Sequence, residues 1–187
     1  QNRIDAVIHL ANIANDPSVE LDPTLSWETN VLSSMKICEF AKKNNIKKVI
    51  YASSGSVYGI KEDKNVTEDL PLEPISLYNK TKMIAERVFF SYRDDFLINI
   101  IRPATVCGYS RKMRLDLSVN ALTFSALSKN IINVYGGNQI RPNIHIKDMI
   151  GAYNFFIEND IDSGFYNAGF ENISILDIAK KISKKVE

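Results

Sequence analysis

The sequence predicts an α/β fold in which a doubly wound parallel sheet is followed by a smaller C-terminal part. The first observation is that short apolar runs alternate with longer stretches of helical periodicity. The second is that these runs are apolar throughout, which is typical of parallel strands that helices cover on both faces. The composition, 45% hydrophobic and 24% charged, is that of an ordinary globular protein.

Three apolar runs in the first half of the chain are predicted strands: residues 6–10 (AVIHL), 48–52 (KVIYA) and 96–101 (FLINII). Helical periodicity covers residues 23–43 and 77–92. The earlier of these helices is expected to bury one face, formed by Val31, Met35, Cys38 and Ala41. Right-handed crossovers place the carboxyl ends of parallel strands at one edge of the sheet, where ligands bind. The segments that follow the three strands are therefore expected to meet there.

After Gly108 the predicted elements become shorter. They are a helix at 117–128, a strand at 131–135, a turn at Gly136 and Gly137, residues 144–148 leading into a helix at 149–158, a strand at 164–168, and a helix at 175–186 capped by Ser174. We expect this change to separate a sheet-forming part, residues 1–108, from a mainly substrate-facing part, residues 109–187. His145 is expected to be buried and structural, and Asp148 to cap the helix that follows it.

Charge and cysteine content exclude several classes of protein. The formal net charge is +1, so no overall field favours nucleic acid or a membrane surface as a partner. No apolar run approaches the ~20 residues that span a bilayer. The densest basic stretch, at residues 180–185, is expected to be a solvated helix face. Cys38 and Cys107 are far apart, which argues against a disulfide framework or a zinc site. We expect a cytoplasmic protein without a bound metal.

One constellation of residues carries chemistry. Tyr78 and Lys82 are four residues apart on a predicted helix, so both side chains lie on one face. A positive charge beside a phenol favours the phenolate, and such a tyrosine can exchange a proton with an alcohol or carbonyl oxygen. This spacing alone is weak evidence. It gains weight from Ser53 and Ser54, which follow a predicted strand and are expected at the same rim of the sheet.

Six segments occur in an informative order: HLAN (9–12), YASSGSVYG (51–59), YNKTK (78–82), IRPATVCG (101–108), RPNIHIKD (141–148) and FYNAG (165–169). Together they resemble the signature segments of the extended short-chain dehydrogenase/reductases that act on nucleotide sugars, the NAD-dependent epimerase/dehydratase family. The resemblance implies a Rossmann-like sheet, of which residues 1–108 form the C-terminal portion. The family's glycine-rich loop and first strands are expected to lie upstream of Gln1.

The resemblance also implies a role for each matching residue. Ser54, Tyr78 and Lys82 correspond to the catalytic residues. The cofactor, NAD or NADP, is expected to lie against Ala11, Asn12, Asn30, Ala52, Ser53, Tyr78, Lys82, Pro103 and Ala104. The nucleotide-diphosphate sugar is expected to contact Ser54, Thr105, Asn120 and Arg141. Arg141 is expected to bind the diphosphate, because a guanidinium offers paired donors for phosphate oxygens. The family further implies a homodimer, paired through the helical faces of residues 23–43 and 77–92.

The activity that this resemblance implies is 4-epimerisation through a 4-keto intermediate. A nucleotide-sugar dehydrogenase or a ketosugar reductase is the first alternative, and a non-catalytic dinucleotide-binding module or inactive fragment is the second. The family's dehydratases carry Asp-Glu where this sequence has Gly55 and Ser56, which argues against a 4,6-dehydratase. Two of the segments are similar to those of epimerases from surface-polysaccharide pathways.

Overall fold

The computed structural model describes residues 3–63 and 65–186. These residues form two compact units, each built from two stretches of chain. The first unit comprises the described part of Gln1–Pro103 together with Ala152–Asn167, and the second comprises that of Ala104–Gly151 and Ala168–Glu187. The functional division predicted at residue 108 stays a prediction, because it concerns what each part binds.

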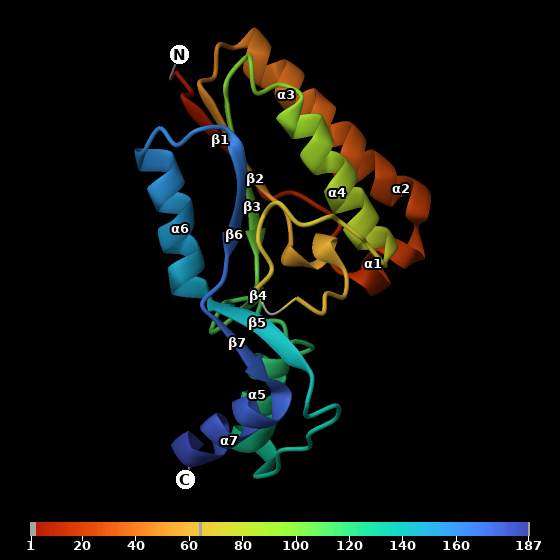
Figure 1. Ribbon diagram of the computed structural model, residues 1–187, viewed down its shortest axis with the longest axis vertical. Coiled ribbons are helices and arrows are strands. Elements are labelled where there is room, and N and C mark those ends of the chain that lie inside the picture. Colours follow the sequence, from red (N-terminus) through yellow and green to blue (C-terminus); the bar gives the residue numbers. More distant parts are fainter. Residues whose placement is uncertain (1–2, 64, 187) are drawn as a thin grey trace. The chain divides into compact units, whose positions relative to one another are not determined.

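The first unit contains a four-stranded sheet with the order β1 (Ala6–His9), β2 (Lys48–Ala52), β3 (Leu97–Pro103) and β6 (Gly164–Ala168) (Figure 1). The first three strands are parallel, and their register pairs Val7 with Val49 and Val49 with Ile98. All three predicted strands of this half are confirmed. The α/β class with its parallel sheet is confirmed as well.

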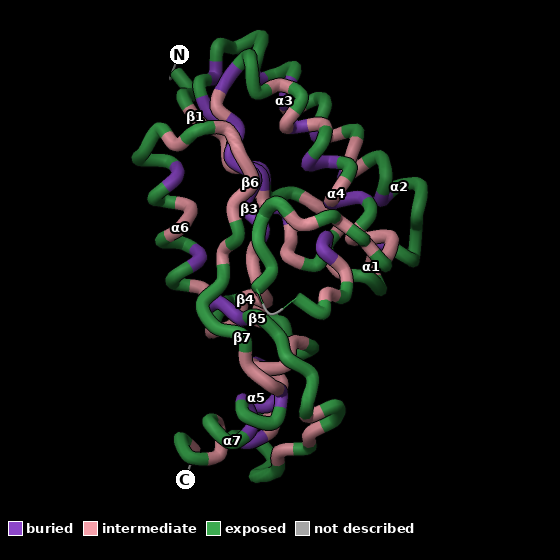
Figure 2. The backbone as a smooth tube through the Cα atoms, in the orientation of Figure 1, coloured by how far each residue is buried: buried purple, intermediate pink, exposed green. Residues whose placement is uncertain are grey.

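Helices cover both faces of this sheet (Figure 1). On one face lie α1 (Asp16–Leu21), α2 (Pro23–Trp27), α3 (Ser33–Lys43) and α4 (Leu77–Phe90), and on the other lies the part of α6 (Ile146–Glu158) that belongs to this unit. Val49 and Tyr51 of β2 pack against Cys38 of α3 and against Ala85 and Phe89 of α4. Figure 2 shows that the buried positions follow the strands and the inner sides of these helices.

The helix predicted at residues 23–43 is real, but its buried face differs from the prediction. A π-helical segment, η1 (Glu28–Leu32), joins α2 to α3 and widens the repeat, so the buried positions are Ser26, Asn30, Ser34, Cys38 and Ala41. Cys38 and Ala41 were predicted correctly, whereas Val31 is half-buried and Met35 is exposed. The buried polar groups are satisfied locally, since the Ser34 hydroxyl donates to the Asn30 carbonyl at 3.0 Å.

The second unit has a three-stranded sheet with the order β4 (Thr105–Cys107), β5 (Ile140–His145) and β7 (Glu171–Ser174). β4 and β5 are parallel, and β5 and β7 are antiparallel. Helices α5 (Ser118–Lys129) and α7 (Ile175–Val186) share a core of Leu122, Ile175, Ile178 and Ala179. The Ser174 cap is confirmed, because its hydroxyl accepts the Asp177 N–H at 3.0 Å.

The strand predicted at residues 131–135 is wrong. Ile132 and Val134 are apolar because they pack against the core of α5 and α7, and neither pairs with a strand of the described chain. The strand of this region is β5, which follows the predicted glycine turn. That turn is confirmed: Gly136 has a φ of 62°, and its carbonyl accepts the Gln139 N–H at 2.9 Å.

The predictions for His145 and Asp148 also need correction. His145 is exposed rather than buried. It immediately precedes α6, and its Nδ1 accepts the Lys147 N–H at 3.3 Å, so the imidazole caps the helix. Asp148 lies in the first turn of α6 instead, where its negative charge is favourable to the helix dipole.

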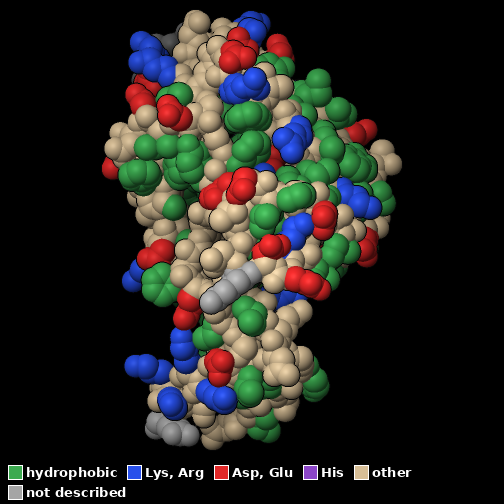
Figure 3. All heavy atoms as spheres, viewed as in Figure 1, with side chains coloured by type: hydrophobic (Ala, Val, Ile, Leu, Met, Phe, Trp, Pro, Cys, Tyr) green, Lys and Arg blue, Asp and Glu red, His purple; other side chains and the backbone are tan. Residues whose placement is uncertain are grey.

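Two further expectations concern the surface and the thiols. Lys180, Lys181, Lys184 and Lys185 of α7 belong to the predicted basic face, and Figure 3 shows Lys and Arg side chains gathered around this helix. Both cysteines are free thiols. Along residues 3–63 and 65–186, no helix is sufficiently long and apolar to cross a membrane.

Candidate active site

A serine turn follows β2 at the carboxyl rim of the sheet. The Ser53 N–H donates to the Ile101 carbonyl at 2.8 Å, which extends the pairing of β2 with β3. The chain then enters a short 3₁₀ helix, Gly55–Tyr58. A Cβ on Gly55 would lie 3.1 Å from the Pro103 carbonyl oxygen, so a side chain there would press on the end of β3. The turn therefore holds Ser54 beside the ends of two strands.

Hydrogen bonds join this turn to the start of α4. The Ser54 and Ser56 hydroxyl oxygens lie 2.7 Å apart, and the Ser56 hydroxyl donates to Asn79 Oδ1 at 2.6 Å. α4 begins after Ser76, whose hydroxyl accepts the Asn79 N–H at 3.2 Å. Asn79 is the neighbour of Tyr78 in sequence. The turn that carries Ser54 and the helical turn that carries Tyr78 are thus held together through Ser56.

Lys82 lies one helical turn beyond Tyr78 and is almost completely buried, with 4% of its surface exposed. Its Nζ donates to the Ala52 carbonyl at 2.6 Å and lies 5.8 Å from the centroid of the Tyr78 ring. Burial lowers the pKa of Lys82 to about 7, although the Glu86 carboxylate opposes that effect. The charge of this amine is therefore sensitive to any group that approaches it at neutral pH.

Several buried polar groups near this rim lack hydrogen-bond partners within the described part of the chain. They are Nε2 of His9, the hydroxyl of Tyr51, and both side-chain polar atoms of Asn12. Burial and the nearby Lys82 both lower the pKa of His9, so its imidazole is neutral at pH 7. Unpaired buried polar atoms are costly, and a ligand rich in hydroxyl, amide and phosphate groups would satisfy them. These residues therefore fit a dinucleotide such as NAD.

The other predicted cofactor residues have varied surroundings. Ala11 is exposed, and Ala52 and Pro103 are half-buried. Asn30 is fully buried: its Oδ1 accepts the Ile13 N–H at 2.8 Å, and its Nδ2 donates to the Thr81 hydroxyl at 3.1 Å. The Ser53 hydroxyl donates to Glu86 Oε1 at 2.5 Å. The side chains of Asn30 and Ser53 thus form hydrogen bonds within the protein, and each holds a loop of the rim against α4.

The predicted substrate residues Thr105, Asn120 and Arg141 belong to the second unit, as does Ala104. Thr105 opens β4, and Arg141 is exposed on β5. Asn120 is buried, where its Oδ1 accepts the Gly108 N–H and its Nδ2 donates to the Arg114 carbonyl, both at 3.0 Å. Arg141 therefore has its guanidinium open to an anionic ligand, whereas Asn120 holds the loop before α5.

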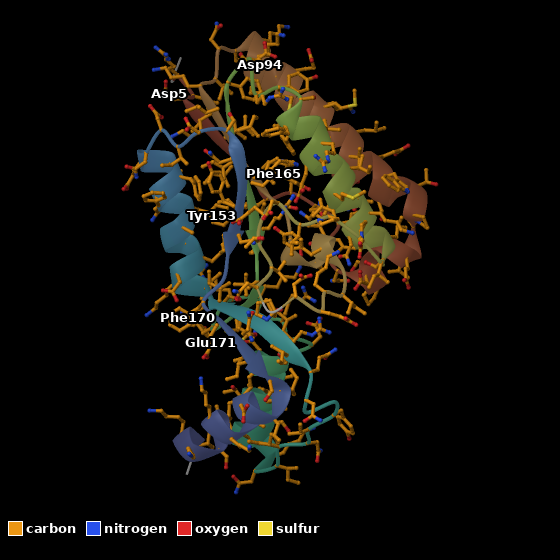
Figure 4. The ribbon with its side chains drawn as sticks, viewed as in Figure 1. Asp5, Asp94, Tyr153, Phe165, Phe170 and Glu171 are labelled. Atoms are coloured by element: carbon orange, nitrogen blue, oxygen red, sulfur yellow. The ribbon has the colours of Figure 1, made fainter. Side chains whose placement is uncertain are left out.

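A pocket of about 300 Å³ also lies within the second unit. Its walls are mostly apolar and come from β5, β7 and α7. Asn143, Phe170 and Glu171 contribute to them, and Figure 4 labels the last two. Asn143 Oδ1 is buried and has no partner among the residues described. The pocket is large enough to hold a small organic group.

The prediction from sequence did not include Glu86, Arg102, Tyr58 or Asn79 as site residues. Glu86 is fully buried and Arg102 nearly so, and they form an ion pair at 2.7 Å. One signal was available: Glu86 is four residues after Lys82 and lies between the apolar residues Ala85 and Phe89, and Arg102 directly follows the apolar run at residues 96–101. A charged residue at a core position needs a partner of opposite charge, so the two positions together indicated a buried ion pair between Glu86 and Arg102.

A parallel sheet with a serine turn at its carboxyl rim, and a tyrosine and a buried lysine one turn apart on the next helix, define a class of dinucleotide-dependent enzymes. The family model described as "NAD dependent epimerase/dehydratase family" matches residues 1–169. The chain belongs to this family.

Individual relatives agree with that assignment. UDP-glucose 4-epimerase of Lactobacillus helveticus is 25% identical over an alignment 205 residues long, gaps included, that covers 97% of this chain and 62% of that protein. MoeE5, solved in complex with UDP-glucuronic acid and NAD, superposes with a TM-score of 0.85 at 26% identity, over 97% of this chain and 62% of its own. UDP-N-acetylglucosamine 4-epimerase from Methanobrevibacter ruminantium M1 gives 0.84 at 27% identity, over 96% and 60%. The chain thus spans less than two thirds of the length of these relatives.

Proposed function

We propose that the protein carrying this chain is an NAD-dependent nucleotide-sugar epimerase that inverts C4 of the hexose through a 4-keto intermediate. The observation that carries the proposal is the burial of Lys82 beside Tyr78, with its amine anchored to the Ala52 carbonyl at the rim. Family membership and the UDP-sugar epimerases among the relatives support it. A nucleotide-sugar dehydrogenase or a ketosugar reductase remains the alternative, because Ser54, Tyr78 and Lys82 would serve those reactions equally well.

In the proposed mechanism NAD supplies the acceptor and donor of hydride at C4. Tyr78 takes the proton of the C4 hydroxyl during oxidation and returns it during reduction. Lys82, when charged, stabilises the Tyr78 phenolate. The Ser56 hydroxyl donates to Asn79, so the Ser54 hydroxyl donates to Ser56 at 2.7 Å in the free protein. It would turn to donate a hydrogen bond to the same sugar oxygen when the substrate binds. Ser56 offers a hydroxyl rather than the carboxylate that eliminates water in the dehydratases, so this site favours oxidation and reduction at C4.

We propose that the cofactor site is lined or supported by Ala11, Asn12, Asn30, Ala52, Ser53, Pro103 and Ala104. The nucleotide-sugar site would be lined or supported by Thr105, Asn120 and Arg141. NADP is the alternative cofactor, and a non-catalytic dinucleotide-binding module is the second alternative function. We place the protein in the cytoplasm, in the synthesis of surface polysaccharides.

The activity can be tested with the intact protein and with UDP-glucose and UDP-N-acetylglucosamine as substrates, with NAD and NADP in parallel. We expect the C4 epimer to form, detected by NMR of the sugar, while NADH absorbance stays near zero. Accumulation of NADH in proportion to substrate would support the dehydrogenase instead. Binding of NAD without conversion of any nucleotide sugar would favour the non-catalytic module.

We also propose that the protein is a homodimer that pairs through α3 and α4. Three large apolar side chains are exposed on α3, on α4 and on the π-helical segment before α3, namely Met35, Ile84 and Leu32, and Figure 3 shows hydrophobic side chains gathered there. We expect Met35→Lys to convert a dimer of the intact protein to a monomer in analytical ultracentrifugation. Lys36→Met is the control on the same helix, and it should leave the mass unchanged. A monomeric unsubstituted protein would contradict the proposal.

A further inference from the structure

A buried ion pair lies beneath the proposed active site. Arg102 Nε and Nη2 donate to Glu86 Oε1 and Oε2 at 3.0 and 2.7 Å, a bidentate arrangement. The side chain of Glu86 is 0% exposed and that of Arg102 is 2% exposed. The rings of Tyr58 and Phe165 lie 4.9 and 4.6 Å from the guanidinium carbon, and Figure 4 shows Phe165 on β6 facing α4. Solvent is therefore kept away from both charges.

This pair joins the elements that build the rim. The Ser53 hydroxyl donates to the same carboxylate, so the end of β2 is tied to α4. Arg102 Nη1 donates to the Tyr58 hydroxyl at 2.7 Å, and that hydroxyl donates to Asn167 Oδ1 at 2.8 Å. β2, β3, β6, the serine turn and α4 thus share one continuous network.

The position of Glu86 on α4 links the network to the proposed catalytic residues. Glu86 follows Lys82 by four residues and Tyr78 by eight, so all three lie along one side of the helix. Holding Glu86 by two donors from β3 and one from the serine turn fixes both the rotation of α4 and its position along its axis. A shift of about 1 Å in such a group can lower a rate about 100-fold.

Stability alone does not explain the pair. Two apolar residues of similar volume are often as stable as a buried ion pair, or more so, because the charges lose their hydration. A bidentate pair differs in that it tolerates only one relative placement of its elements. Its benefit here is therefore geometric.

We propose that Glu86 and Arg102 are positioning residues, which hold α4 in the one register that aligns Tyr78 and Lys82 with the serine turn. The inference rests on the proposed function for its catalytic consequence. A second consequence, the effect of Glu86 on the charge of Lys82, is independent of the proposed function. It follows because Glu86 is the anion that interacts with Lys82.

The charge of Lys82 depends on the ionisable groups around it. These are His9 of β1, Tyr51 of β2, Tyr78 and Glu86 of α4, and, behind Glu86, Arg102 of β3. Glu86 raises the pKa of Lys82, whereas burial lowers it. Neutralising Glu86 removes the carboxylate of this set and leaves the Arg102 cation uncompensated. Both changes lower the pKa of Lys82 further.

The test uses Glu86→Gln in the intact protein, with Lys48→Met as a matched control. Lys48 is also buried, and its Nζ donates to the carbonyls of Phe156, Ile157 and Asn159 at the end of α6. We expect Glu86→Gln to lower kcat about 10–100-fold with KM for the sugar changed less than about threefold, and the control to lower thermal stability with kcat nearly unchanged. Equal kcat values for the two variants would overturn the positioning role.

A second readout does not depend on turnover. Acylation of Lys82 by a small anhydride, followed by mass spectrometry as a function of pH, reports its amine directly. We expect the midpoint to move to lower pH in Glu86→Gln and to stay in place in Lys48→Met. An unmoved midpoint in Glu86→Gln would overturn the electrostatic link, even if the unsubstituted protein turns over no sugar and the proposed function fails.

Arg102→Lys keeps the charge but not the bidentate geometry, and it tests the network if Glu86→Gln does not fold. We expect kcat to fall about tenfold while the acylation midpoint stays near that of the unsubstituted protein. Full retention of kcat in this variant would overturn the proposal.

Discussion

Replacing Tyr78 with Phe is expected to lower kcat for the nucleotide sugar about 10²–10⁴-fold, since the variant has no group to exchange a proton with the C4 oxygen. Only one oxygen atom is removed from a half-buried side chain at the start of α4, so the melting temperature should change little. The measurement is steady-state epimerisation by the intact protein, with thermal unfolding monitored in parallel.

Tyr153 provides the matched control for this substitution. It is a half-buried tyrosine on α6, labelled in Figure 4, and burial together with Tyr78 raises its pKa to about 12. Its phenol is therefore not poised to lose a proton near neutral pH. Tyr153→Phe should leave kcat within about threefold of the unsubstituted value. If Tyr78→Phe retained turnover to the same extent, the enzymatic assignment of Tyr78 would have to be withdrawn.

Replacing Lys82 with Met should make the protein inactive and, at neutral pH, more stable. Burial lowers the pKa of Lys82 from 10.5 to about 7. The unfolded chain therefore binds more protons than the folded chain between these values, and the free energy of unfolding rises with pH across that window. Below about pH 7 the folded protein carries the full cost of a buried charge. At about 1.36 kcal/mol per pKa unit, that cost is at most about 5 kcal/mol.

Chemical denaturation between pH 6 and pH 10 measures this effect. The Lys82→Met variant should be more stable than the unsubstituted protein at pH 6, and the difference should shrink as the pH rises. Lys48→Met should instead lose stability, because Lys48 donates to three carbonyls and pairs with Asp160 at 3.0 Å. A Lys82→Met variant that is less stable than the unsubstituted protein at pH 6 would show that Lys82 is held for stability and not for chemistry.

Local pattern was sufficient wherever an element is defined by its own residues. The β-branched run at residues 48–52 is a buried strand, and the spacing of Tyr78 and Lys82 places both on one helix. Ser174 caps α7 through a contact three residues away. These features depend on backbone periodicity and on hydrogen bonds between near neighbours, which a sequence displays directly.

The errors came from contacts between distant segments. Ile132 and Val134 have the composition of a strand but pack against helices instead. The predicted buried face of the helix at residues 23–43 missed Asn30, which is buried because its side chain bonds to Ile13 and Thr81, and periodicity does not predict contacts with such distant segments.

The sequence by itself determined β1, β2 and β3, the helix α4, the serine turn and the Tyr78–Lys82 pair, because each follows from residues that are close together along the chain. The tertiary structure decided which polar groups are buried together. Glu86 and Arg102 are 16 residues apart, and Tyr58 and Asn167 are 109 apart, so only the folded sheet brings them into contact. Burial makes these contacts necessary, because charged groups and hydroxyls that are removed from water are costly unless they form hydrogen bonds or ion pairs with one another.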